Sequence, residues 1–138
     1  MRKIILPMAL FAFASVALWA ADGGAIEANG KYHWVHGGGK KHDNGDLKAF
    51  FTPAGKNKWT VKFHFSWKKE KHVYSGVVTG SLKNGSLSGR IESDDKKPRI
   101  FAFSANAKDG AITGKHWEIR TRKGKEIKTD TGTFELSL

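Results

Sequence analysis

The sequence predicts an all-β domain, an antiparallel up-and-down meander of about eight strands. Apolar and polar residues alternate with period two, no window after the N-terminal segment has helical periodicity, and an Asn-Gly or Asp-Gly motif recurs between the alternating segments. A meander of this many strands removes its unpaired edges most simply by closing, so we expect a closed barrel. A β-sandwich is the alternative, because a sequence pattern does not show closure.

The first twenty residues have the layout of a secretory signal peptide. Arg2 and Lys3 precede the apolar run from Ile4 to Ala14, and small residues suited to cleavage follow. We therefore expect a signal peptide over 1–20, a single domain over 21–138 and a secreted or periplasmic protein with no membrane span after cleavage. An uncleaved anchor is the alternative, since the whole apolar stretch is just long enough to cross a bilayer.

The composition limits how the domain is stabilised and what it meets. The chain has no cysteine, so structural disulfides are excluded and a hydrophobic core must hold the domain together. Without Arg2 and Lys3 there are 22 basic against 13 acidic residues, a net charge of +9. This charge favours anionic partners, although a solvated charged surface explains it equally well.

The expected strands are separated by turn residues. In chain order they cover 30–36, 46–52, 57–69, 72–83, 86–93, 98–108, 111–122 and 125–137, with Gly132 as the point where the last would break. The clearest is the long strand, in which Trp59, Val61, Phe63, Phe65 and Trp67 occupy one face and polar residues the other. That pattern is typical of a strand with one face in a core.

A repeated motif predicts the turns. "LKNGSLSGR" at 82–90 aligns with "AKDGAITGK" at 107–115, and "HDNGDLKAF" at 42–50 is a weaker third copy. Asn-Gly and Asp-Gly favour tight hairpins, so we predict turns at 44–45, 84–85 and 109–110, each followed by an aliphatic residue that re-enters the core. Apart from the glycine-rich loop that begins at residue 37, the longest loop is expected at 93–99.

Three segments resemble avidin-type barrels: "NGSLSGRIES" at 84–93, "NKWTVKFHFSWKK" at 57–69 and "VYSGVVTG" at 73–80. Small barrels of the avidin and lipocalin superfamilies, the calycin type, share this style of glycine-marked hairpin. The segments occur here in a different order from that of avidin. The resemblance therefore implies a small β-barrel fold and carries over no biotin-binding residue.

Candidate ligand-binding residues lie on the first strand, in the glycine-rich loop and on the long strand: Trp34, His36, Lys40, Lys41, Trp59, Phe63 and Trp67. The amides of three consecutive glycines, with the two lysines beside them, can bind an anion, and the alternative is a mobile linker. The aromatic residues can line a ligand site in a barrel mouth, and the alternative is a filled core.

The sequence predicts no metal site, no cofactor and no catalytic residue. His33 and His36 fall on opposite faces of a strand. His36 and His42 remain a candidate pair, because they could meet across the glycine loop, where Asp43 or Asp46 could add oxygen ligands for zinc or copper; surface histidines around a flexible loop are the favoured alternative. His116, Glu118 and Arg120 share a strand face that could bind a polar ligand or do acid–base work. We expect that face to point outward, with Trp117 and Ile119 in the core.

The leading function is therefore that of an exported, non-enzymatic binding protein. Its ligand would be a small, partly apolar molecule in the barrel mouth, or an anionic ligand or glycan on the basic surface. A protein-interaction or inhibitor-type module, using its hairpin loops against an acidic partner, is the alternative. An enzyme using His116 and Glu118 is third. Nucleic acid is not an expected partner, because no recognised motif accompanies the basic charge.

Overall fold

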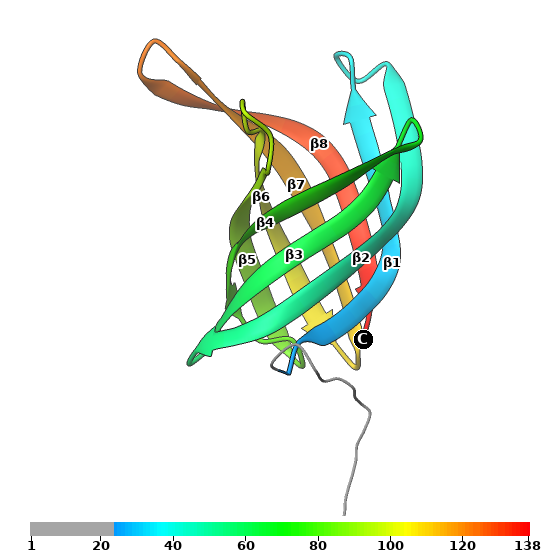
Figure 1. Ribbon diagram of the computed structural model, residues 1–138, viewed down its shortest axis with the longest axis vertical. Coiled ribbons are helices and arrows are strands. Elements are labelled where there is room, and N and C mark those ends of the chain that lie inside the picture. The colour runs from blue at the N-terminus through cyan, green and yellow to red at the C-terminus, as the bar shows by residue number, and fades with distance from the viewer. Residues whose placement is uncertain (1–23) are drawn as a thin grey trace, which may run out of the picture.

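The computed structural model describes residues 24–138, which form one closed antiparallel barrel (Figure 1). Its strands are β1 (Ile26–His36), β2 (Lys41–Gly55), β3 (Lys58–Trp67), β4 (Glu70–Gly80), β5 (Gly85–Ser93), β6 (Ile100–Lys108), β7 (Ala111–Arg122) and β8 (Lys125–Ser137). Each strand pairs with the next, and β8 pairs with β1. The predicted meander and its closure are thus confirmed, and the sandwich alternative is wrong.

The predicted signal peptide lies outside the described residues. Within 24–138, no helix is long and apolar enough to cross a membrane.

Strand β3 has the alternation that the sequence predicts. Val61 and Phe63 are buried, and Lys62 and His64 between them are exposed. Residues of one parity therefore point into the barrel, and those of the other parity face solvent.

The first hairpin differs from the prediction. β2 begins at Lys41 rather than residue 46, and the turn consists only of residues 37–40, with all three glycines at positive φ. Asn44 and Gly45, expected to form a turn, are paired with His33 and Tyr32 inside the β1–β2 ladder. A Cβ at Gly45 would lie 2.6 Å from the Tyr32 ring, so glycine is needed here for packing and not for a turn.

Of the other two predicted turns, one is confirmed and one is wrong. Asp109 and Gly110 both have positive φ and join β6 to β7 directly, which confirms the predicted tight hairpin. At 84–85 the prediction is wrong, because only Gly85 has positive φ. A longer loop forms there, in which the Ser81 hydroxyl accepts hydrogen bonds from the amides of Lys83 and Asn84.

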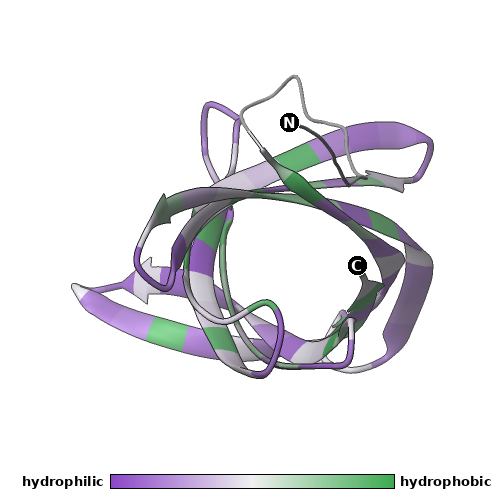
Figure 2. Cartoon of the chain, turned by 90° about the horizontal axis from the view of Figure 1, so that it is seen from below, coloured by the Kyte–Doolittle hydropathy of each residue, from purple (hydrophilic) through white to green (hydrophobic). Residues whose placement is uncertain are grey.

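Seen along the barrel, the strands close into a ring whose residues vary between hydrophobic and hydrophilic along each strand (Figure 2). Inside the barrel, large rings lie against small residues. Phe63, Phe103 and Phe134 meet edge to face, with ring centroids 5.6 to 6.3 Å apart. Gly114 lies beneath this group, because a Cβ there would come within 2.9 Å of the Phe134 ring. Edge-to-face contacts of this kind add about 0.5–1.5 kcal/mol per pair beyond the burial itself.

The seam between β8 and β1 depends on Gly132. Its φ of +127° is rarely adopted by residues with a side chain, and a Cβ would lie 1.9 Å from the carbonyl oxygen of His33 on β1. Next to it, Thr131 has no partner in the β7–β8 register, which passes from His116–Gly132 to Trp117–Asp130. The sequence predicted a break at Gly132; the strand instead continues through it with a bulge.

We expect Gly132→Ala to lower the free energy of unfolding by about 3 kcal/mol, because backbone strain and a clash with a neighbouring strand each contribute about 1–3 kcal/mol. Urea unfolding measures the loss. Thr133→Ser, an exposed change on the same strand, serves as the control and should shift stability by less than about 0.5 kcal/mol. Equal stability of Gly132→Ala and the wild type would contradict the tight β8–β1 approach.

Candidate ligand cavity at the barrel mouth

The two ends of the barrel are packed differently. At the end where β1 begins and β8 terminates, the side chains of Leu82, Leu87, Ile112 and Leu136 are buried and fill the interior. Trp59 lies at this filled end, where its Nε1 donates a hydrogen bond to the carbonyl oxygen of Gly80 at 3.1 Å. Trp59 is therefore placed away from the other candidate ligand-binding residues.

The opposite end contains a cavity of about 160 Å³. Its wall is mainly aromatic and apolar, formed by Tyr32, Trp34, Leu47, Phe63, Phe65, Trp67, His72, Tyr74, Ile91, Asp95, Arg99, Phe101, Phe103, His116 and Phe134. Phe63, Phe103 and Phe134, whose rings contact one another edge to face, are among these lining residues. We call this end of the barrel the mouth.

One side of the mouth is formed by β1, β2 and β3. The His36 ring stacks on Trp34, with centroids 4.2 Å apart, and its Nε2 lies 2.6 Å from a carboxylate oxygen of Asp43. The same Asp43 oxygen accepts a hydrogen bond from Trp67 Nε1 at 3.2 Å. These bonds, first that from His36 and then that from Trp67, hold the pKa of Asp43 below its ordinary value.

Arg99 reaches across the mouth from the start of β6. Its guanidinium lies 5.3 Å from the ring centroids of both Trp34 and Phe101. Its Nε and Nη2 each donate a hydrogen bond to Glu118 at 3.0 Å, and Arg120 donates a third to the same carboxylate at 3.2 Å. The guanidinium thus covers part of the cavity and is held there by a buried carboxylate.

Glu118 and His116 face inward, which corrects the prediction for this strand. They share the parity of Ile112, which is buried, and His116 lines the cavity. The prediction relied on Trp117 and Ile119; Trp117 is half-buried beside Lys128, while Ile119 is buried. Ile112 and Gly114 mark the face of β7 that points into the barrel. The prediction relied instead on Trp117 and Ile119, farther along the strand, and so chose the opposite face.

The pKa values of both interior groups are lowered, but by different causes. Burial lowers the pKa of His116, and hydrogen bonds with the backbone of His33 and Thr133 only partly oppose it. Burial by itself raises the pKa of Glu118, but the hydrogen bonds and charges of Arg99 and Arg120 outweigh it and hold the pKa below 4.5. The Nδ1 of His116 lies 2.6 Å from the Thr131 hydroxyl, so its partner is the residue at the bulge.

Two residues of the cavity wall carry a buried polar atom that has no hydrogen-bond partner. Within residues 24–138, the buried side-chain nitrogens without a partner are Trp34 Nε1, His72 Nε2 and Trp117 Nε1. The first two belong to residues that line the cavity; Trp117 does not line it. A buried polar atom without a partner costs about 1–3 kcal/mol, so these two residues place unfavourable polar burial beside the cavity.

The structure brings together four of the predicted ligand-binding residues. Trp34, Phe63 and Trp67 line the cavity, and His36 stacks on Trp34 beside it. Lys40 lies in the first turn, and Lys41 begins β2; both are exposed at the mouth end.

The candidate pair His36 and His42 does not come together. His36 and His42 have opposite parity at the β1–β2 hairpin, and His36 bonds to Asp43 instead. The described part of the chain holds no group of three or more His, Cys, Asp or Glu side chains arranged to bind a metal ion.

The sequence does not single out several residues that line the cavity: Tyr32, His72, Tyr74, Arg99, Phe101 and Phe134. Parity could have identified some of them, because His72 and Tyr74 share the parity of the buried Val78 on β4. Arg99 ends a polar loop, and nothing in its sequence neighbourhood signals that it crosses the mouth.

Comparison with protein-family models, with curated proteins and with solved structures finds no match to this chain. The resemblance to avidin- and lipocalin-type barrels therefore stays a prediction. The closed eight-stranded meander gives the architecture without identifying a family.

The ion pairs of Glu118 predict a pH-dependent contribution to stability. Because its folded-state pKa is lowered, the contribution is present above pH 4.5 and lost as the pH falls through the folded-state pKa. We expect Glu118→Gln to be less stable than the wild type by about 2 kcal/mol at pH 7. This is less than the usual 3–5 kcal/mol for a broken buried pair, because the Arg99 side chain is 37% exposed.

Urea unfolding of both proteins between pH 7 and pH 2 measures this difference, which should narrow in acid. Glu92→Gln, an exposed carboxylate on β5, is the control and should differ little from the wild type at any pH. A stability gap that is independent of pH would contradict the assignment to the ionised carboxylate.

Proposed function

We propose that the protein is an exported, non-enzymatic binding protein that takes a small, partly apolar ligand in the mouth of its barrel. The observation that carries the proposal is the aromatic cavity, two of whose lining residues have an unpaired buried nitrogen. Export is supported by the N-terminal sequence alone, which has the layout of a signal peptide.

The volume of the cavity accommodates about one ring. An engineered apolar cavity of about 150 Å³ in another protein stays dry and binds benzene, and the cavity here, at about 160 Å³, has a similar size. Typical drug-sized ligands need about 300–1,000 Å³, which is well above it. The ligand class that fits is therefore a single aromatic or alicyclic ring with one short substituent.

The polar atoms indicate the chemistry of that substituent. Trp34 Nε1 can only donate a hydrogen bond, and Arg99 still has donors at Nη1, because Glu118 engages its Nε and Nη2. Both groups are hydrogen-bond donors, so a ligand needs a hydrogen-bond acceptor to pair with them. A carboxylate or phenolate oxygen satisfies them best, since charge-assisted hydrogen bonds are about twice as strong as neutral ones.

The contacts of His116 and Glu118 weigh against the enzyme alternative. Both groups are enclosed, as acid–base work would require, but Glu118 is held ionised by two arginines and is a poor proton donor near neutral pH. The protein-interaction alternative draws on the lysine-rich loops and leaves the unpaired nitrogens of the two cavity-lining residues without an explanation.

A titration with single-ring probes tests the proposal. We expect benzoate to bind wild-type protein with a measurable heat by calorimetry, and 1-anilinonaphthalene-8-sulfonate, which is too large for the cavity, to bind at least tenfold more weakly. Trp34→Phe keeps a ring and removes the N–H, so benzoate affinity should fall about tenfold, the equivalent of one hydrogen bond to a charged group.

Trp117→Phe is the matched control, because it removes an equally unpaired indole N–H outside the cavity, and benzoate affinity should not change. Native mass spectrometry of protein from its secretion host gives an independent measurement and would show a co-purifying small molecule. The absence of binding for benzoate and for its neutral analogue benzyl alcohol, together with ligand-free purified protein, would refute the cavity proposal.

A further inference from the structure

The positive charge of the protein is concentrated at the mouth. The four segments at that end, residues 37–43, 68–72, 94–99 and 118–128, hold thirteen lysines and arginines against six acidic residues. At the filled end, residues 24–27, 55–58, 81–85 and 108–111 hold four basic and two acidic residues. The mouth end therefore carries a net charge of +7, most of the +9 that remains without Arg2 and Lys3.

Three of the six acidic groups at the mouth are already paired. Glu118 accepts hydrogen bonds from Arg99 and Arg120, Asp43 binds His36, and Glu126 forms an ion pair with Arg90 on the barrel wall at 3.1 Å. Except for Arg99, every basic residue of the four segments is exposed. The uncompensated charge at this end is therefore positive and open to solvent.

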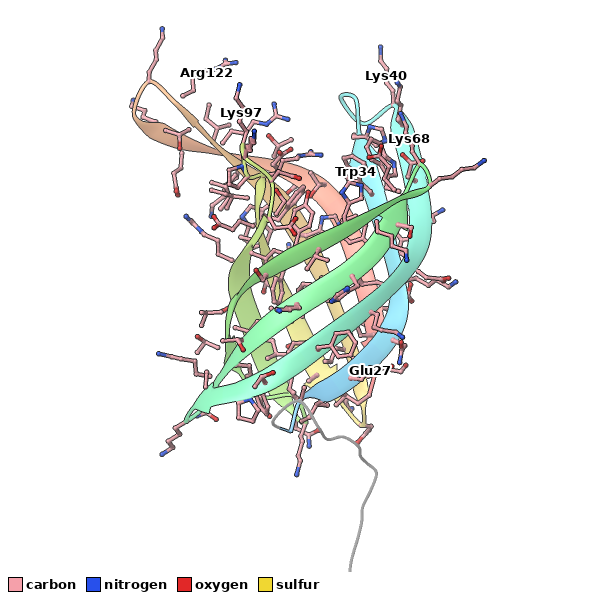
Figure 3. All side chains as sticks on the ribbon, in the orientation of Figure 1. Glu27, Trp34, Lys40, Lys68, Lys97 and Arg122 are labelled. Atoms are coloured by element: carbon pink, nitrogen blue, oxygen red, sulfur yellow. The ribbon has the colours of Figure 1, made fainter. Side chains whose placement is uncertain are left out.

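The basic residues surround the opening. Figure 3 shows Lys40, Lys68, Lys97 and Arg122 at one end of the barrel and Glu27 at the other. The first three lie in three separate connections between strands, and Arg122 ends β7. The β7–β8 hairpin extends farthest: β6 pairs with β7 only as far as Ile119, and β1 pairs with β8 only from Gly132 onward. The segment 120–127 thus projects past the barrel rim (Figure 1).

This arrangement fits a broad anionic surface better than a linear polymer. Charges on four loops around an opening meet a plane together, whereas a polymer chain is bound along a groove. Ten of the thirteen basic residues are lysines. A lysine ammonium is a flexible point charge and, unlike an arginine guanidinium, does not form paired hydrogen bonds with a phosphate group. Ile127, 41% exposed on the projecting hairpin, and the half-buried Trp34 and Trp67 at the rim suit the interfacial zone of a bilayer.

We propose that the mouth end docks on an anionic lipid membrane, with the barrel opening turned toward the bilayer. Attraction to anionic headgroups is worth about 1 kcal/mol for each lysine or arginine near the surface, so several of the exposed cations suffice for reversible binding. The docking itself does not depend on a cavity ligand. If the proposed function also holds, docking places the opening of the apolar cavity against the lipid bilayer, where apolar ligands concentrate.

Vesicle sedimentation tests the docking. In 50 mM salt we expect full-length mature protein to bind vesicles of phosphatidylcholine with 30% phosphatidylglycerol and not pure phosphatidylcholine vesicles, and to be released in 500 mM salt because the charges are then screened. Lys96→Glu/Lys97→Glu should weaken binding at least tenfold. Lys56→Glu/Lys83→Glu, which changes the net charge equally at the filled end, should retain it to within about twofold.

Orientation is measured separately, and the lack of native cysteine makes this direct. The emission of an environment-sensitive fluorophore on Lys97→Cys should shift to the blue on adding anionic vesicles, and that of the same label on Lys83→Cys should not.

No vesicle binding in low salt, equal losses of binding in the two charge-reversed variants, or a shift of both labels would overturn the docking proposal. Binding to a soluble polyanion such as heparin without binding to vesicles would also overturn it, in favour of a polymeric partner. Benzoate calorimetry on the same samples reports on the cavity independently.

Discussion

The fixed interior of the closed barrel is the constraint on which the other features depend. Because β8 pairs with β1, the strands cannot move apart, and the side chains inside must fit a space of constant size. Small residues on some strands accept the rings of others, as Gly45 does for Tyr32 and Gly114 for Phe134. Aliphatic side chains fill one end of the barrel, and at the other end the three central phenylalanines are among the residues that line a cavity.

That division assigns different roles to the two ends. The filled end supplies stability through buried aliphatic side chains, and the mouth carries the groups whose burial is unfavourable without partners. Glu118 is compensated by Arg99 and Arg120, whereas Trp34 Nε1 and His72 Nε2 are left unpaired. A binding site is expected where unfavourable burial of this kind collects, because the scaffold around it is stable enough to tolerate it.

The candidate site combines short-range selection with long-range attraction. Inside the mouth, ring-sized apolar space and a few hydrogen-bond donors favour a small acceptor-bearing ring. Outside it, exposed lysines on four loops create a positive field that acts over about a Debye length. The two proposals use different groups, Trp34 and Arg99 in one and residues such as Lys96 and Lys97 in the other, so each can fail without the other.

The sequence by itself determined the strand meander and the inward face of β3, because a period of two is a local property that survives folding. It also determined the turn at 109–110. Only the tertiary structure decided that Gly45 accepts a ring within a strand, that β7 turns His116 and Glu118 inward, and that Arg99 reaches Trp34 across the mouth. Each of these depends on which residues of distant strands become neighbours when the barrel closes, and closure is not encoded in the pattern of any single strand.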